Sequence, residues 1–207
     1  MISIINKIRF HIIRKHSLNL LKSRPGFDKD AVYLTFDDGP EPCITEFILD
    51  ELKKHEIKAT FFCCGNNCVK NAKLLERIKE EGHSIANHTD SHINGYTTPF
   101  STYIEDVERC ESYIKTQTFR PPWGALTLKL YNKLRKNYRI VYWDVVSGDT
   151  EMENFKFDVA YNNLISKIKP GSIVLFHFCK KHEKETMQIL PAFLQYIKNN
   201  NIKTRTI

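Results

Sequence analysis

The alternation of short apolar segments with longer amphipathic ones is the feature that most constrains the fold of this chain. The short segments are rich in β-branched and aromatic residues, as buried strands are, and the longer ones have the apolar spacing of helices. Strands are expected over residues 31–35, 58–64, 83–87, 139–146, 172–178 and 202–207, and helices over 46–55, 71–81, 103–114, 126–136, 155–169 and 183–199. Six or seven repeats of strand then helix predict one parallel sheet with right-handed crossovers.

Polar residues that can do chemistry follow several of the expected strands. They are Asp37, Asp38, His88, Asp149 and His177, joined by Arg120 from a proline-fixed turn over residues 119–124. The carboxyl ends of parallel strands meet at one edge of a sheet, where active sites of such folds are built. The pattern therefore predicts one shared site at that edge.

Two histidines four positions apart suggest a metal site. One turn of helix or a tight loop brings His88 and His92 to the same face. With the carboxylate of Asp38 they would form a three-ligand site for a divalent cation, with a position left open for water. Zinc is the expected ion, although cobalt, nickel, iron or manganese also suits these ligands. The neighbouring Asp37 would stay free to act as a base.

The chain resembles the polysaccharide deacetylases of carbohydrate esterase family 4, the NodB homology domain. The resemblance spans residues 31–207 and rests on five short motifs in the family's order: Thr-Phe-Asp-Asp-Gly at 35–39, His-Thr-Asp-Ser-His at 88–92, Arg-Pro-Pro-Trp at 120–123, Asp149, and Leu-Phe-His at 175–177. It implies a distorted, incomplete (β/α)7-type barrel with parallel strands. It also implies a metal-dependent hydrolase that uses metal-activated water to remove the acetyl group from N-acetylated sugars of a glycan, such as peptidoglycan, a chitin-like polymer or a surface polysaccharide.

The resemblance assigns roles to individual residues. Asp38, His88 and His92 would hold the metal ion, Asp37 would be the catalytic base kept ionised by Arg120, and His177 would be the general acid oriented by Asp149. Pro122, Trp123 and Leu175 would bind substrate, with the backbone N–H of Trp123 at the oxyanion and Leu175 in the acetyl pocket. The chain departs from the family at two positions. Thr150 replaces a Trp that usually follows Asp149, and Phe178 replaces an acidic residue that commonly follows His177.

The distribution of charge argues against a nucleic-acid partner. Residues 1–30 contain seven Lys and Arg against two Asp, a balance of +5, which leaves +2 of the net charge of +7 for the other 177 residues. The body of the protein is nearly neutral and has no basic stripe interleaved with aromatic residues. The six cysteines form no paired C-x-x-C motif, and we expect reduced, buried thiols.

The first 30 residues are expected to form an arm or helix beside a catalytic domain over residues 31–207. Within residues 1–22, charges interrupt the apolar sequence too often for a signal peptide or a membrane span. One interpretation is a helix packed on the domain, and the other is a basic amphipathic segment in peripheral contact with an anionic membrane. The expected location is the cytoplasm or a membrane surface.

Other functions fit parts of the same pattern. The main alternative is a deformylase or amidase that acts on a small or lipid-linked acylated sugar, because Thr150 changes the expected acyl pocket. A glycan-binding relic without turnover would keep the fold and the metal site. A non-haem iron oxygenase also uses two histidines and one carboxylate, but the sequence shows no second substrate site for it.

Overall fold

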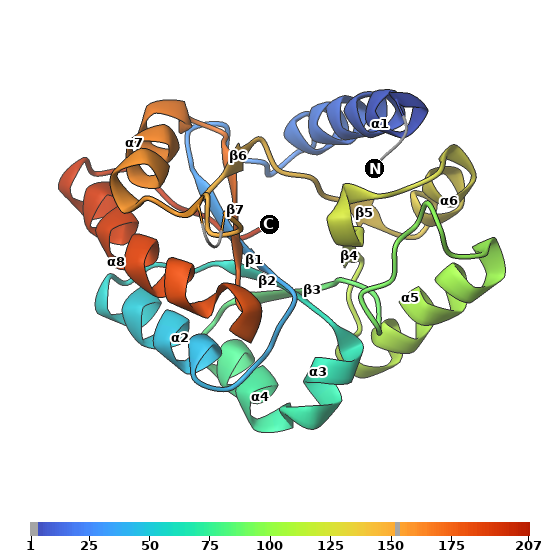
Figure 1. Ribbon diagram of the computed structural model, residues 1–207, viewed down its shortest axis with the longest axis horizontal. Helices are drawn as coiled ribbons and strands as arrows, with labels where there is room; N and C mark the ends of the chain where they lie inside the picture. Colours follow the sequence, from blue (N-terminus) through green and yellow to red (C-terminus); the bar gives the residue numbers. More distant parts are fainter. Residues whose placement is uncertain (1–3, 152–153) are drawn as a thin grey trace.

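The computed structural model describes residues 4–151 and 154–207, in which seven parallel strands form one sheet (Figure 1). The strands are β1 (Tyr33–Asp37), β2 (Thr60–Cys63), β3 (Ser84–Asn87), β4 (Thr118–Phe119), β5 (Arg139–Ile140), β6 (Val145–Val146) and β7 (Ile173–His177). Their order across the sheet is β5-β4-β3-β2-β1-β7-β6, and every neighbouring pair is parallel. The predicted parallel sheet is confirmed.

The sheet is curled into an incomplete barrel. Strands β5 and β6 lie at opposite edges of the sheet, yet only residues 141–144 separate them in the chain. An extended chain spans at most about 3.6 Å per residue, so the two edges lie within about 18 Å of each other. The sheet can meet that limit only by curling until its edges nearly join. The expected distorted (β/α)7-type barrel is confirmed, with its opening between β5 and β6.

Two of the expected strands are wrong. Residues 139–146 do not form one strand, because the chain leaves β5 at one edge and crosses the barrel opening before it enters β6 at the other. Residues 202–207 form no strand of the sheet, and only Thr204 makes a bridge, to Val32 just before β1. Both neighbouring positions of β1 are already occupied by β2 and β7, which leaves the C-terminal segment no edge to join.

The helices follow the predicted positions closely. They are α1 (Ile4–Lys22), α2 (Ile44–Lys54), α3 (Gly65–Lys70), α4 (Ala72–Glu80), α5 (Phe100–Ile114), α6 (Leu128–Leu134), α7 (Phe157–Lys167) and α8 (Glu183–Asn199), with short 3-10 helices η1 (Pro122–Gly124) and η3 (Lys180–His182). Helix α8 has the predicted bounds, whereas α3 was not anticipated. Strand β4 and η1 replace the extended turn expected over residues 119–124.

Aromatic side chains fill the space between the sheet and its covering helices. Phe36 stacks on Phe61 at 5.1 Å between ring centroids, and it also meets Phe176 from the neighbouring strand. Phe176 in turn packs on Phe193 of α8. Each of these four side chains is fully buried. Burial of this area stabilises the strand order, at about 25 cal/mol for each Å² of apolar surface removed from water.

Helix α1 lies on the side of the molecule where β5 and β6 approach each other (Figure 1). Its inner face buries Ile13, Ser17 and Leu21, and it contacts β5 and α6. Within the described residues, no helix combines the length and the apolar character that crossing a membrane requires.

Candidate active site

The carboxyl ends of the central strands surround one cavity. Asp37 at the end of β1 is paired in register with His177 at the end of β7, and His88 directly follows β3. The cavity has a volume of about 570 Å³, which is the size of a small-molecule site. It is lined by Asp37, Asp38, His88, His92, Trp123, Trp143, Val146, Asp149, Thr150, Leu175, His177, Lys181 and His182.

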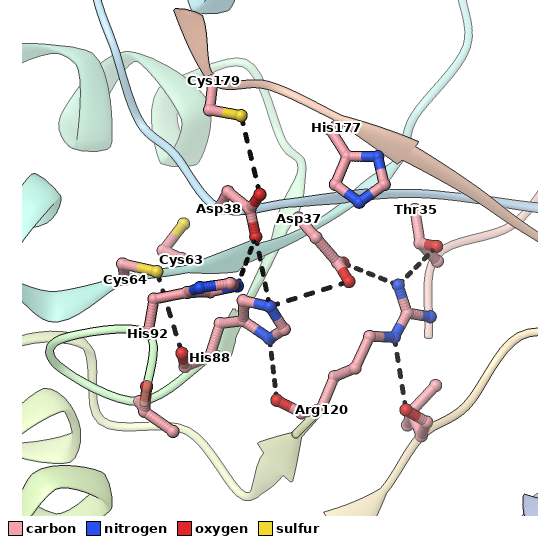
Figure 2. A network of polar contacts seen from close by, with 12 residues as sticks. Thr35, Asp37, Asp38, Cys63, Cys64, His88, His92, Arg120, His177 and Cys179 are labelled. Carbon is pink, nitrogen blue, oxygen red and sulfur yellow. Dashed lines mark hydrogen bonds and ion pairs between the residues drawn. The ribbon is translucent and has the colours of Figure 1, made fainter. Parts of the chain in front are cut away.

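Three side chains converge as metal ligands would. Asp38, His88 and His92 each offer one donor atom, and these atoms lie within 4.8 Å of one another. Asp38 Oδ1 is 3.3 Å from His88 Nε2 and 3.0 Å from His92 Nε2 (Figure 2). Ligands held about 2.0–2.2 Å from a tetrahedral zinc ion stand roughly 3–3.5 Å apart, so the donor set fits such an ion. Among the described residues no other group of this kind is present.

Hydrogen bonds orient these three side chains. The Nδ1 of His88 lies 2.7 Å from the backbone carbonyl oxygen of Arg120, so Nδ1 carries the proton and the Nε2 lone pair faces Asp38. The second oxygen of Asp38, Oδ2, accepts from the thiol of Cys179 at 3.5 Å. Asp38 and His92 have φ values of 87° and 54°, a conformation that costs an ordinary residue free energy and is often found at functional sites. Burial disfavours the charged form of Asp38, but hydrogen bonds from the two histidines hold the pKa of its carboxyl group well below the usual range.

Asp37 lies beside this group and is held by a buried arginine. Arg120 is fully buried and donates from Nη1 to Asp37 Oδ1 at 2.7 Å and to Thr35 Oγ1 at 2.8 Å. Its guanidinium carbon is 4.0 Å from the ring centroid of Phe62, so an aromatic face supports the cation as well. Burial lowers the pKa of Arg120, and the charge of Asp37 opposes that shift. Asp37 Oδ2 is 3.8 Å from His88 Nε2, which places a carboxylate next to the ligands.

A second acid–imidazole pair faces the same cavity. Asp149 is buried and accepts two hydrogen bonds from His177, from Nδ1 at 3.0 Å and from the backbone N–H at 2.7 Å. The hydroxyl of Thr186 in α8 donates to Asp149 as well. Burial alone would lower the pKa of His177, but the charge of Asp149 raises it to about 9. Figure 2 shows the His177 ring beside Asp37, in the same view as Asp38, His88 and His92.

Comparison with known proteins shows the family of the chain. A sequence model of the family described as polysaccharide deacetylase matches residues 24–140, more than half of the chain. The chain belongs to the polysaccharide deacetylase family.

Several curated relatives of this chain act on peptidoglycan, according to their names. The chain is 37% identical over 161 residues to a peptidoglycan-N-acetylglucosamine deacetylase of Bacillus cereus, a match that covers 73% of this chain and 57% of that protein. It is 31% identical over 167 residues to the peptidoglycan-N-acetylmuramic acid deacetylase PdaA of Bacillus subtilis, covering 76% of this chain and 63% of that protein. The chain thus spans less than two thirds of the length of these two relatives.

Solved structures show the same fold. The chain resembles the crystal structure of the Bc1960 peptidoglycan N-acetylglucosamine deacetylase with a TM-score of 0.81 and 31% identity, covering 87% of both chains. A family 4 carbohydrate esterase from Streptomyces lividans, solved with acetate, gives a TM-score of 0.75 and 25% identity over 86% of this chain and 92% of that one.

Most residues selected from the sequence line the cavity. Arg120 lies behind Asp37 instead, and Pro122 is buried in η1 outside the cavity lining. Trp123, which follows Pro122, is 60% exposed and lies against His92 at 5.1 Å between ring centroids. Leu175 lines the cavity and is 5% exposed.

The sequence analysis did not anticipate four other lining residues, namely Trp143, Val146, Lys181 and His182. Trp143 lies within residues 139–146, and the wrong prediction of one long strand there gave no reason to place it at the cavity. His182 follows His177 by five residues, and its buried ring lies 5.0 Å from that of His177. Its place just after a strand that ends in the site was the available signal.

The two departures from the family pattern lie in different environments. Thr150 is exposed and lines the cavity. Its side chain is smaller than that of tryptophan, so it covers less of the cavity at this position. Phe178 is fully buried and packs edge-on against Phe61 at 5.1 Å, pointing into the core. Asp149 and Thr186 therefore support His177 without help from its chain neighbour.

Proposed function

We propose that this polysaccharide deacetylase is a metal-dependent N-deacetylase that hydrolyses the acetamido group of N-acetylated sugars in a glycan, with peptidoglycan as the first substrate class to test. The observation that carries the proposal is the meeting of three elements in one cavity: the Asp38–His88–His92 group, the Asp37–Arg120 pair and the Asp149–His177 pair. The names of the relatives, which include peptidoglycan and chitooligosaccharide deacetylases, support the substrate class.

The proposed cofactor is one divalent cation held by Asp38, His88 and His92, and zinc is our first candidate. The carboxylate and two imidazole nitrogens are ligands that zinc prefers, and their spacing fits a single ion. When bound, such an ion polarises an amide carbonyl group and makes a water molecule more acidic.

In the proposed reaction, Asp37 accepts the proton of the attacking water, whose oxygen forms a bond to the amide carbon. The salt bridge to Arg120 keeps Asp37 an anion in its buried position. The backbone N–H of Trp123 donates to the oxyanion that develops on the substrate. His177, charged and held by Asp149, gives its proton to the sugar nitrogen as the carbon–nitrogen bond breaks. The products are acetate and a free amino sugar.

Release of acetate from peptidoglycan and from N-acetylglucosamine oligomers tests this function. The zinc-loaded protein should release acetate, and dialysis against a chelator should stop the release until zinc is returned. Asp37→Asn should lower kcat by about 100-fold or more, because it removes the proton acceptor without changing the shape of the site. N-formylated sugars form a second arm, since faster release of formate would identify the alternative deformylase. Metal-loaded protein that acts on no acylated sugar would refute the proposal.

We further propose that α1 makes peripheral contact with an anionic membrane. Four isoleucines on its outer face, Ile4, Ile5, Ile8 and Ile12, are 54–77% exposed. The helix also carries five Lys and Arg and no acidic residue, so its charge complements an anionic lipid surface.

Sedimentation with phosphatidylglycerol vesicles tests this contact, with phosphatidylcholine vesicles as the neutral comparison. The protein should sediment only with the anionic vesicles, and the double variant Ile8→Ser/Ile12→Ser should remain in the supernatant. Equal recovery of the two proteins with either vesicle would refute the contact. If the parent forms dimers in a concentration-dependent way and the double variant does not, the outer face of α1 binds a second copy of the chain instead.

A further inference from the structure

The inner face of α1 contacts each of three consecutive residues in the segment that crosses the barrel opening. Phe10 meets the ring of Tyr142 edge-on at 5.9 Å and that of Trp143 at 6.2 Å. Arg14 donates from Nε to the carbonyl oxygen of Trp143 at 2.7 Å. At the end of the helix, Lys22 forms an ion pair with Asp144 at 2.5 Å. The helix is therefore fixed to residues 142–144 along most of its length.

That segment carries part of the cavity wall. Trp143 lines the cavity, and the guanidinium carbon of Arg120 lies 5.5 Å from its ring. The backbone carbonyl oxygen of Val141, at the start of the crossing segment, accepts a hydrogen bond from Arg120 Nε at 3.2 Å. Arg120 in turn holds Asp37, so the position of the crossing segment affects the base as well as the wall.

Phe10 also packs against Gly124, which follows the cavity-lining residue Trp123 in the chain. This glycine has a φ of +65°, and a Cβ built on it would lie 2.4 Å from the Phe10 ring and 3.2 Å from Trp143. No side chain fits at residue 124 while Phe10 occupies this position. The hydroxyl of Tyr142 donates to the Gly124 carbonyl at 3.2 Å, and the residue before Gly124 is the exposed Trp123. One side chain of α1 therefore packs between Trp143 and Gly124, the residue that follows Trp123.

We propose that Phe10 is a positioning residue for the deacetylase site, and that α1 is a working part of the cavity rather than a separate arm. Its ring fixes the Trp123–Gly124 turn and Trp143 relative to each other. This proposal rests on the proposed function only for its activity measurement, because the packing can be measured without turnover. Loss of the ring would leave a void that the two wall segments could move into. A displacement of about 1 Å in a catalytic site can cost about 100-fold in rate.

The test compares Phe10→Ala with Ile12→Ala in the full chain, in buffer without vesicles. Ile12 lies on the same helix with its side chain 60% exposed, so the control removes an apolar side chain that does not touch the wall. The chain has two tryptophans, Trp123 and Trp143, and both line the cavity, so intrinsic fluorescence reports on the wall directly.

Phe10→Ala should make the fluorescence more accessible to acrylamide and lower kcat/KM by about 10-fold or more. Phe10→Leu should recover part of both losses, and Ile12→Ala should stay within twofold of the parent. If Phe10→Ala does not fold, Phe10→Leu and Arg14→Gln are compared with Ile12→Ala by the same measurements. Equal quenching and equal kcat/KM in the inner-face and outer-face variants would overturn the proposal. If neither the parent nor any variant has activity, the proposed function fails. Acrylamide quenching then still decides whether Phe10 positions the two wall segments.

A double-mutant cycle tests the contact itself. Gly124→Ala should lower the fluorescence midpoint of thermal unfolding in the parent, because its methyl group meets the Phe10 ring. In the Phe10→Ala background the same methyl group has room, so the loss should be smaller. The backbone strain at the positive φ is the same in both backgrounds and cancels in the comparison. Additive effects would show that the two residues do not meet and would overturn the proposed packing.

Discussion

Replacement of Arg120 by methionine should destabilise the protein far more than the loss of an ordinary arginine. Arg120 is fully buried, and its partner Asp37 is only 3% exposed. The two are joined at 2.7 Å, and Thr35 and the carbonyl of Val141 accept from the same guanidinium group. Methionine has a similar reach but leaves the carboxylate of Asp37, whose side chain is only 4% exposed, without the arginine cation.

The size of the effect follows from that burial. Removing one partner of a buried ion pair typically costs about 3–5 kcal/mol, because the remaining charge stays desolvated. Since whole domains are stable by only about 5–15 kcal/mol, this loss should be easy to measure. The double variant Arg120→Met/Asp37→Asn removes both charges, and replacing a buried pair by neutral groups is often close to neutral in stability. We therefore expect the second substitution to restore about 2–3 kcal/mol of what the first one cost.

Urea unfolding of the metal-free protein at pH 7 measures these free energies for the parent, both single variants and the double variant. Arg77→Met is the matched control. Arg77 forms a 2.5 Å ion pair with Asp50, but their side chains are 30% and 67% exposed, so the loss should stay below about 1 kcal/mol. The reasoning would be refuted if Arg120→Met cost no more than Arg77→Met, or if the effects of Arg120→Met and Asp37→Asn were additive.

Four further predictions concern the proposed metal site, the proposed general acid and the thiols. His88→Ala should weaken zinc binding by more than the roughly 10–100-fold typical of an outer-shell change, which zinc titration against a chromophoric chelator measures. Asp149 raises the pKa of His177 to about 9, so Asp149→Asn should move the alkaline limb of kcat/KM to lower pH. The same pair should stabilise the metal-free protein fully below pH 6.5 and progressively less as pH rises through about 9, a loss that melting temperatures should show in the parent and not in Asp149→Asn. A thiol reagent should modify one cysteine rapidly in the native protein, because Cys43 is exposed and the other five cysteines are buried.

The sequence predicted the parts of the site that depend on local order along the chain. Asp37 and Asp38 at the end of β1, and His88 just after β3, follow from where apolar segments stop. Parallel strands bring their carboxyl ends together, so the convergence of these residues needs no detailed knowledge of packing. The tight loop between His88 and His92 was also one of the two geometries expected for this spacing.

The features that sequence reasoning missed depend on the curl of the sheet. Residues 139–146 have strand composition throughout, and no periodicity tells which part pairs with β4 and which with β7. Only the barrel opening places these parts at opposite edges and turns Trp143 toward the cavity. The relation between Phe10 and Gly124 is equally hidden, because these residues are separated by more than a hundred positions and meet only when α1 covers that opening.

The position after His177, the proposed general acid, shows how the fold accommodates a departure from the family pattern. Successive side chains of a strand point to opposite faces, so when His177 faces the cavity Phe178 must face the core. Its ring lies against Phe61 and within 2.4 Å of where a Cβ of Gly39 would be. Gly39 directly follows Asp38, the proposed metal ligand, so this phenylalanine supports the turn that carries Asp38. An acidic residue here would bury a carboxylate in the core without a cation, at a cost in free energy that no contact on this face offsets. The support of His177 therefore comes from Asp149, which follows the neighbouring strand β6, and Phe178 supports the turn at Gly39 instead.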